Sequence, residues 1–175
     1  MAITCELLAN LEVHQKGRTC EQRRFAVTGS PEGATDYLDA DLRDTDRILA
    51  AAAQTLDFSQ PVAVVLMAIL HLIGDEDDPD GIVGKLTGAI PAGSYLALSH
   101  IASDIDTQAV AEARERVGKL MPVKQTYRNR AEVTRFFDGM QLVPPGVVPV
   151  QEWRPGTAAE GATRSAAWGG VGRKI

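Results

Sequence analysis

Acidic, histidine and hydroxyl side chains follow the apolar segments of this sequence. Asp39 comes first, His71 directly follows the apolar run 62–70, and Ser99 and His100 close a second apolar stretch. A carboxylate accepts hydrogen bonds, and an imidazole, whose ordinary pKa lies near neutrality, can act as a general base. Ligands of open α/β sheets bind at the carboxyl ends of strands, so these residues are the candidates for a functional site.

Each candidate also has a purely structural interpretation. Asp39 opens an acidic turn, and this turn could be a solvated segment whose one role is to cap the next helix. His71 could be packed or hydrogen-bonded without taking part in chemistry, and a structural role for Ser99 and His100 is equally compatible with the sequence. The acidic run 75–78 has the oxygen ligands that Mg²⁺ and Ca²⁺ prefer, but its spacing fits no calcium loop. We therefore expect no metal site.

Helical and strand patterns alternate along the chain. The apolar run 62–70 and the stretch 94–99 predict buried strands, as is typical of parallel sheets. Polar residues that can cap a helix precede apolar residues at helical spacing, and residues 140–143 and 147–152 flank a Pro-Pro-Gly turn that predicts a hairpin. This alternation indicates an open α/β sheet. The expected helix starts are Asp44 or Thr45, Asp78-Pro79, Asp106 or Thr107, and Asn129.

The composition restricts the partners. A net charge of −5 argues against binding of duplex nucleic acid and against docking on an anionic membrane. The longest apolar run, 62–70, is shorter than the roughly 20 residues that span a bilayer. The two cysteines, Cys5 and Cys20, form no metal or disulfide pattern. These features indicate a cytoplasmic protein.

Several longer motifs occur in a fixed order between residues 26 and 155. Together they closely resemble the S-adenosyl methyltransferase family, once filed as a domain of unknown function. The resemblance implies an α/β fold, a Rossmann-like methyltransferase three-layer sandwich that is N-terminally truncated and ends in an antiparallel hairpin. It divides the chain into an unassigned segment 1–25 and a partial methyltransferase domain 26–155, and the Gly-, Ala-, Ser- and Thr-rich composition of residues 156–175 predicts a disordered tail. The motifs are Asp39-Ala-Asp-Leu-Arg-Asp44, Leu70-His71 with the acidic run 75–79, residues 91–100, Arg130-Ala-Glu-Val-Thr-Arg-Phe-Phe-Asp-Gly139, and Val143-Pro-Pro-Gly-Val-Val-Pro-Val150 with Trp153-Arg-Pro155.

The resemblance also implies a cofactor and roles for individual residues. The cofactor is S-adenosyl-L-methionine, and the methyl acceptor is an unidentified small molecule. Asp39 would accept a hydrogen bond from the adenine amino group, and the backbone of Ala40, Asp41 and Leu42 would lie beside the ring. Met67 and Ala68 would line the cofactor through packing and backbone; the alternative is that their side chains are plain core. His71 would be the catalytic general base.

The sequence lacks one part of this family pattern. No Asp-x-Gly-x-Gly turn occurs, nor does the strand that would precede it. The strand at 62–70 would then lack a neighbour unless residues 1–30 or another subunit supplied one, so self-association through the exposed sheet edge is possible. The alternative function is a non-catalytic truncated remnant or an interaction module. A third hypothesis is an α/β module that binds another nucleotide, but the sequence contains no Gly-x-Gly-x-x-Gly motif to support it.

Overall fold

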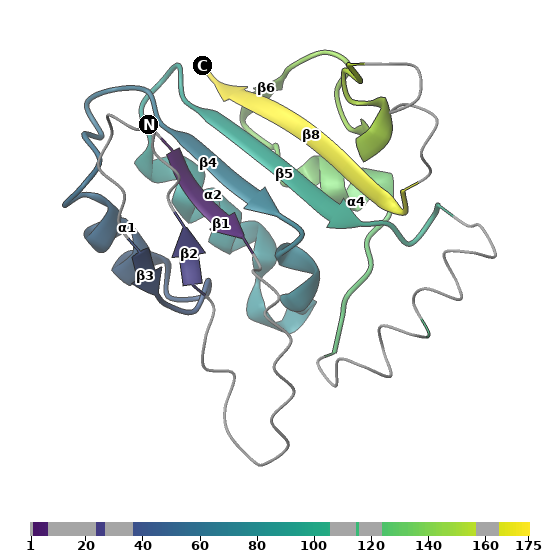
Figure 1. The fold of residues 1–175 in the computed structure, drawn as a ribbon, viewed down its shortest axis with the longest axis horizontal. Coiled ribbons are helices and arrows are strands. Elements are labelled where there is room, and N and C mark those ends of the chain that lie inside the picture. Colours follow the sequence, from purple (N-terminus) through teal and green to yellow (C-terminus); the bar gives the residue numbers. More distant parts are fainter. Residues whose placement is uncertain (1, 7–23, 27–36, 106–114, 116–123, 157–164) are drawn as a thin grey trace.

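The computed structural model describes residues 2–6, 24–26, 37–105, 115, 124–156 and 165–175. A mixed sheet forms their centre, with the strand order β1-β4-β5-β8-β6 and with β7 paired to β8 (Figure 1). The neighbours β1, β4 and β5 are parallel, whereas β8 runs antiparallel to β5, β6 and β7. The expected α/β class is confirmed. The strands are β1 (Ala2–Glu6), β4 (Ala63–Met67), β5 (Tyr95–Ile101), β6 (Met140–Leu142), β7 (Val148–Pro149) and β8 (Ala167–Lys174).

The helices begin where the sequence predicts. Asp44 caps α1 (Thr45–Ala52) by accepting the Arg47 amide. Asp78 caps α2 (Pro79–Ala89) by accepting the Gly81 amide. A reciprocal capping box of Asn129 and Glu132 opens α4 (Arg130–Arg135). The helix expected from Asp106 or Thr107 lies outside the described residues.

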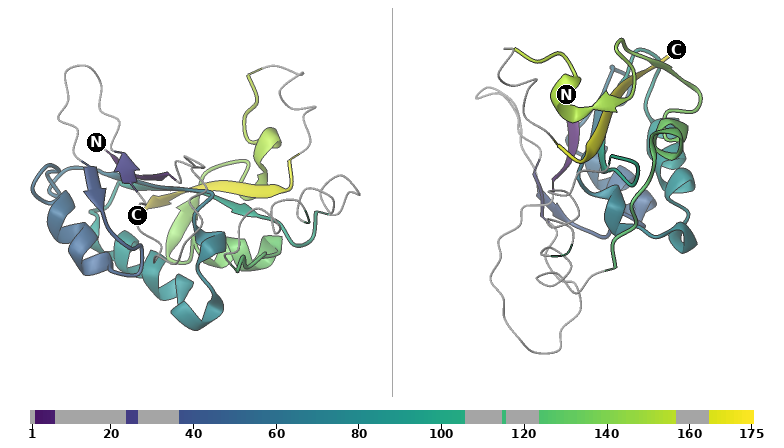
Figure 2. Two further views of the ribbon diagram at one scale, coloured as in Figure 1. Left: turned by 60° about the horizontal axis from the view of Figure 1, so that its bottom comes forward. Right: turned by 90° about the vertical axis from the view of Figure 1, so that its right-hand side faces the viewer.

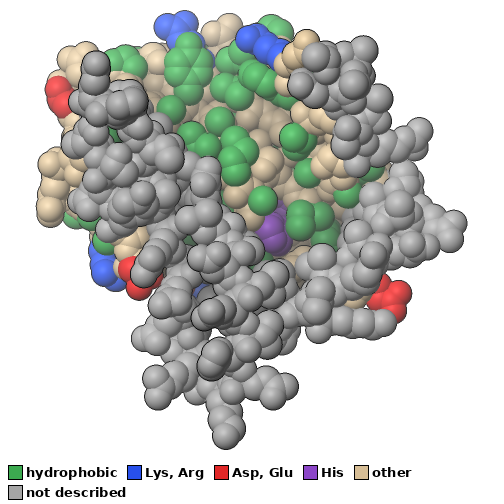
Figure 3. Space-filling model, in the orientation of Figure 1, with side chains coloured by type: hydrophobic (Ala, Val, Ile, Leu, Met, Phe, Trp, Pro, Cys, Tyr) green, Lys and Arg blue, Asp and Glu red, His purple; other side chains and the backbone are tan. Residues whose placement is uncertain are grey.

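These helices cover one face of the main sheet (Figure 2). The alternate residues of β4 and β5 that point to this face, among them Leu66 and Leu98, are buried in one core with the apolar side of α2. On the opposite face the alternate residues of β4 and β5 are half-buried or exposed, and apolar side chains gather on this face (Figure 3). Tyr95 there is 41% exposed. The second helical layer of the expected sandwich does not occur among the described residues.

The N-terminal residues supply the neighbour that β4 needs. β1 pairs with β4 along its whole length, from Ala2 opposite Ala63 to Glu6 opposite Met67. A separate antiparallel pair is formed by β2 (Arg24–Ala26) and β3 (Tyr37–Asp39), and β2 contacts β1. The N-terminal strands thus lie between β3 and β4. β1 therefore covers the edge of β4 on which the expected self-association depended.

The expectation of a disordered tail over 156–175 is wrong for residues 167–174. They form β8, the strand between β5 and β6. Its glycines suggest disorder by composition, but they make room for neighbours. A Cβ at Gly172 would lie 2.8 Å from Phe137 Cδ1, and one at Gly170 would lie 3.1 Å from Phe137 Cζ. Close packing, rather than flexibility, explains these glycines.

The predicted hairpin is also corrected. The antiparallel strands exist, but residues 140–142 do not pair with residues 147–152. Met140–Leu142 pairs with β8 instead, and so does Val148–Pro149. The Pro-Pro-Gly turn therefore joins two strands that share β8 as their partner. Among the described residues, no helix is both long and apolar enough to cross a membrane.

Candidate functional site

The chain turns sharply where β4 ends. Ala68 has a φ of 49°, in the left-handed region that side chains other than glycine disfavour. Beyond Ala68, the apolar run 62–70 no longer continues as a strand. Two short 3₁₀ turns follow, η1 (Leu70–Leu72) and η2 (Asp75–Asp77). The strand predicted from this run is therefore shorter, and His71 lies within η1 instead of directly after the strand.

The turn after β3 is tied to the segment that follows β4. The Arg43 guanidinium donates to Asp41 (Nη2 to Oδ2, 2.7 Å) and reaches Asp77 (Nη1 to Oδ2, 3.2 Å). The hydrogen bond to Asp41 raises the pKa of Arg43 above its ordinary value. Ala40 and Leu42 are buried in the same core as Ile69. The structure thus joins residues 39–42, the first predicted cofactor segment, to the chain that follows Met67 and Ala68, the second segment.

The predicted cofactor residues differ in how they meet solvent. Three can present atoms at the surface, one is half-buried and two are core residues. Since the whole of Leu42 is buried, its side chain packs in the core and the residue supports the turn from beneath instead of contacting a ligand itself. Asp39, Asp41 and Ala68 are exposed, Met67 is half-buried, and Ala40 and Leu42 are buried.

His71 lies in the interior, with only 5% of its surface exposed. Its ring meets the His100 ring edge-on, with 6.4 Å between the ring centroids. Its backbone carbonyl accepts the Thr126 amide at 2.8 Å. A general base must reach the proton that it removes. The burial of His71 therefore favours the interpretation as a packed residue that the sequence left open.

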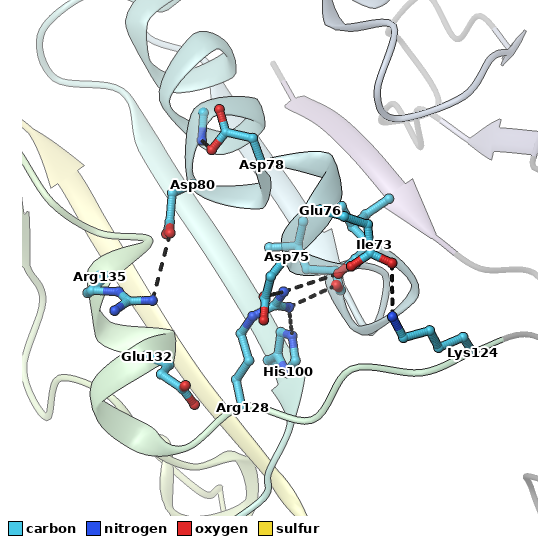
Figure 4. A network of polar contacts seen from close by, with 12 residues as sticks. Ile73, Asp75, Glu76, Asp78, Asp80, His100, Lys124, Arg128, Glu132 and Arg135 are labelled. Atoms are coloured by element: carbon cyan, nitrogen blue, oxygen red, sulfur yellow. Dashed lines mark hydrogen bonds and ion pairs between the residues drawn. The ribbon is translucent and has the colours of Figure 1, made fainter.

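Arg128 is a central residue that sequence reasoning missed. Its side chain is only 4% exposed, and it joins the segment after β4 to the end of β5 (Figure 4). It donates to the carbonyls of Leu70 and Ile73, at 3.2 and 3.1 Å, and to Asp75 Oδ1 at 2.6 Å. No periodic pattern marks a buried arginine, so its role appears only once the distant segments 70–75 and 128 are seen together.

His100 completes this network. Its Nδ1 lies 2.8 Å from the carbonyl of Ile101 and its Nε2 lies 2.9 Å from Arg128 Nη1. This arrangement assigns the proton to Nδ1, which donates, and leaves Nε2 to accept. Burial, followed by the nearby Arg128 charge, lowers the pKa of His100 to about 4. His100 is thus neutral at physiological pH and serves as a structural acceptor.

Each acidic residue of η2 faces a different cation. Asp75 pairs with Arg128, Glu76 with Lys124 at 2.9 Å, and Asp77 with Arg43. Asp78 caps α2. Ion pairs and a helix cap therefore account for the acidic run 75–78. In the part of the chain that the structure describes, no three His, Cys, Asp or Glu residues are grouped as metal ligands.

Comparison with known protein families identifies the family of this chain. The model of the S-adenosyl methyltransferase family matches residues 20–175. The chain therefore belongs to this family, whose members are S-adenosylmethionine-dependent methyltransferases. The match also includes β8, which the motifs in the sequence did not cover.

Solved structures show the same relationship. A DUF574 family protein from Streptomyces avermitilis MA-4680 is 37% identical over 79% of this chain and 54% of that one, with a TM-score of 0.71. A putative methyltransferase from Thermobifida fusca YX is 29% identical over 78% of this chain and 53% of that one, with a TM-score of 0.67. The chain thus spans about half the length of these two relatives. No curated protein matches it.

Proposed function

We propose that this chain contributes the adenine end of an S-adenosylmethionine site and acts in methyl transfer to a small molecule. The observation that carries the proposal is the Asp41–Arg43–Asp77 bridge, which joins the turn after β3 to the segment that follows Ala68. Family membership supplies the identity of the ligand. The two segments come from distant parts of the sequence, as the two sides of a ligand site usually do.

The residues present fit the adenine end of this cofactor. The exposed carboxylate of Asp39 can accept a hydrogen bond from an amino group. The backbone of Ala40 and Asp41 follows it, on a turn fixed by the buried side chain of Leu42. At the end of β4, the half-buried Met67 offers apolar surface.

When bound, S-adenosylmethionine supplies an already activated methyl group, so the protein mainly has to bind and orient the reactants. The residues of this chain would hold one end of the cofactor. We assign His71 no proton transfer. Its burial beside His100 supports a packing role under the site, in place of the general-base role that the family resemblance suggests.

Isothermal titration with S-adenosylhomocysteine tests the proposal. We expect the chain to bind, and we expect Asp39→Ala to weaken binding about tenfold, because a hydrogen bond to a charged group contributes about 1.5 kcal/mol or more. Asp138→Ala, which changes an exposed carboxylate just after α4, is the matched control and should bind like the unmodified chain. No heat at millimolar ligand would reject the proposal.

A second candidate is an interaction module without methyl transfer. One sequence observation favours it: the sequence that follows β1 contains no glycine before Gly17, so it lacks a glycine-rich motif directly after this strand. The titration distinguishes the two candidates, since this module would bind no S-adenosylhomocysteine. We also propose a cytoplasmic location, which two cysteines without a pairing pattern support.

A further inference from the structure

Ala68 has a conformation that needs an explanation. For an alanine, the left-handed region costs about 1–2 kcal/mol relative to the ordinary helical conformation. Such residues persist where the surrounding structure fixes them, and they are frequent at functional sites. Ala68 is exposed, directly follows β4 and has a φ of 49°.

Ser99 is the residue that fixes it. The amide of Ala68 donates to the Ser99 hydroxyl at 3.0 Å and lies 3.3 Å from the Ser99 carbonyl oxygen. Ser99 lies in β5, in register with Met67 of β4. One residue thus holds the Ala68 amide through both its side chain and its backbone.

The strand that carries Ser99 is firmly anchored. Its neighbours Leu98 and His100 are buried on the helix-covered face, and His100 is bound to Arg128. Because side chains alternate along a strand, Ser99 projects to the other face, on which Met67 also lies. Its hydroxyl group is therefore a fixed acceptor at the carboxyl end of β4.

We infer that Ser99 is a positioning residue of the cofactor site: its hydroxyl group holds the backbone of Ala68 in the turn that presents Met67 and Ala68 to the ligand. This inference rests on the proposed function. It differs from a purely structural role for Ser99 in what it predicts. A structural bond would change the stability of the fold, whereas a positioning bond also sets the affinity for the ligand in the folded protein.

The test compares S99A, S99T and the unmodified chain by titration with S-adenosylhomocysteine at 10 °C, with thermal unfolding measured in parallel. S99A removes the hydroxyl acceptor and leaves only the longer contact to the carbonyl of residue 99. We expect it to weaken binding by about three- to tenfold, the effect of one hydrogen bond. S99T keeps the hydroxyl group and suits a strand, so its affinity should stay within about twofold of the unmodified chain.

A further variant covers the case in which S99A does not fold. S99C keeps the shape of the side chain but offers only a weak sulfur acceptor. It should weaken binding as S99A does. Equal affinity of the unmodified chain and of the folded S99A or S99C variant would overturn the inference and leave the proposed function standing. If the unmodified chain binds no S-adenosylhomocysteine, the proposed function fails and this inference fails with it.

Discussion

Arg128 Nη1 lies 2.9 Å from His100 Nε2, in a part of the molecule where both side chains are buried. This contact joins β5 to the segment that leads into α4. The same guanidinium holds the carbonyls of Leu70 and Ile73. One side chain thereby fixes the segment after β4 that bears His71, together with the strand that bears Ser99.

Loss of the Arg128 guanidinium should lower the free energy of unfolding. Arg128→Met leaves the buried Ile73 carbonyl and one imidazole nitrogen without this donor, and each such group costs about 1–3 kcal/mol, whereas the Leu70 carbonyl keeps the Ile73 amide as a donor. We expect the free energy of unfolding in urea to fall by about 3 kcal/mol. Arg135→Met is the control, because Arg135 is 60% exposed and its pair with Asp80 is long, at 3.8 Å. It should change stability by less than about 0.5 kcal/mol. Equal effects of the two variants would contradict the network.

Stability should fall in mild acid because of His100. Well above pH 6.5, the ordinary pKa of histidine, its imidazole is neutral in both the folded and the unfolded chain. Between pH 6.5 and the folded pKa of about 4, the unfolded chain takes up a proton that the folded chain does not accept. The free energy of unfolding should therefore decrease as the pH falls through this window, by up to about 3 kcal/mol from this group.

The variant His100→Gln tests whether that pH dependence belongs to His100. Glutamine cannot titrate, so the slope of unfolding free energy against pH between 6.5 and 5 should become shallower. Urea unfolding at several pH values gives the slope. An unchanged slope in His100→Gln would assign the acid sensitivity to other groups.

Substitution of the closely packed glycines of β8 should destabilise the protein. A Cβ at Gly172 would meet Phe137 Cδ1 at 2.8 Å and Met140 Cβ at 3.2 Å. We expect Gly172→Ala to destabilise the protein by about 1–3 kcal/mol through overpacking. Gly84→Ala is the matched control, because it lies in α2 with nothing within 4 Å of its Cβ. It should stabilise the helix by up to about 1 kcal/mol. A disordered tail would instead tolerate Gly172→Ala without any change in urea unfolding.

The ion pairs of Arg43 should matter more for ligand binding than for folding. Arg43 is 49% exposed, so Arg43→Met should change the free energy of unfolding by less than about 1 kcal/mol. It would also release the turn after β3 from Asp77. We expect a several-fold weaker affinity for S-adenosylhomocysteine by titration. Full affinity in Arg43→Met would show that the bridge does not shape the site.

The local structure could largely be predicted from the sequence. Asp44, Asp78 and Asn129 cap helices as expected, since a cap depends on a few adjacent residues. The buried strands at 63–67 and 95–101 follow from continuous apolar runs. Within the site, the proximity of the Asp39 turn to the segment after β4 came from the family resemblance.

Long-range partners could not be predicted in the same way. β1 forms by parallel pairing with β4, and no pattern in residues 2–6 predicts that pairing. The glycines of β8 suggested disorder because their composition does not reveal Phe137 packed against them. Likewise, His71 directly follows an apolar run in the sequence, but the turn at Ala68 carries it into the interior. In each case the outcome depends on residues far away in the chain.

The most direct test of the account is to map the ligand onto the folded chain. Uniformly ¹⁵N-labelled protein should be titrated with S-adenosylhomocysteine while amide chemical shifts are recorded. We predict that the largest changes fall in residues 39–42 and 67–69, at the two joined segments. Changes confined to another surface, such as the hollow lined by residues 53–58, or no changes at millimolar ligand, would contradict the proposed site.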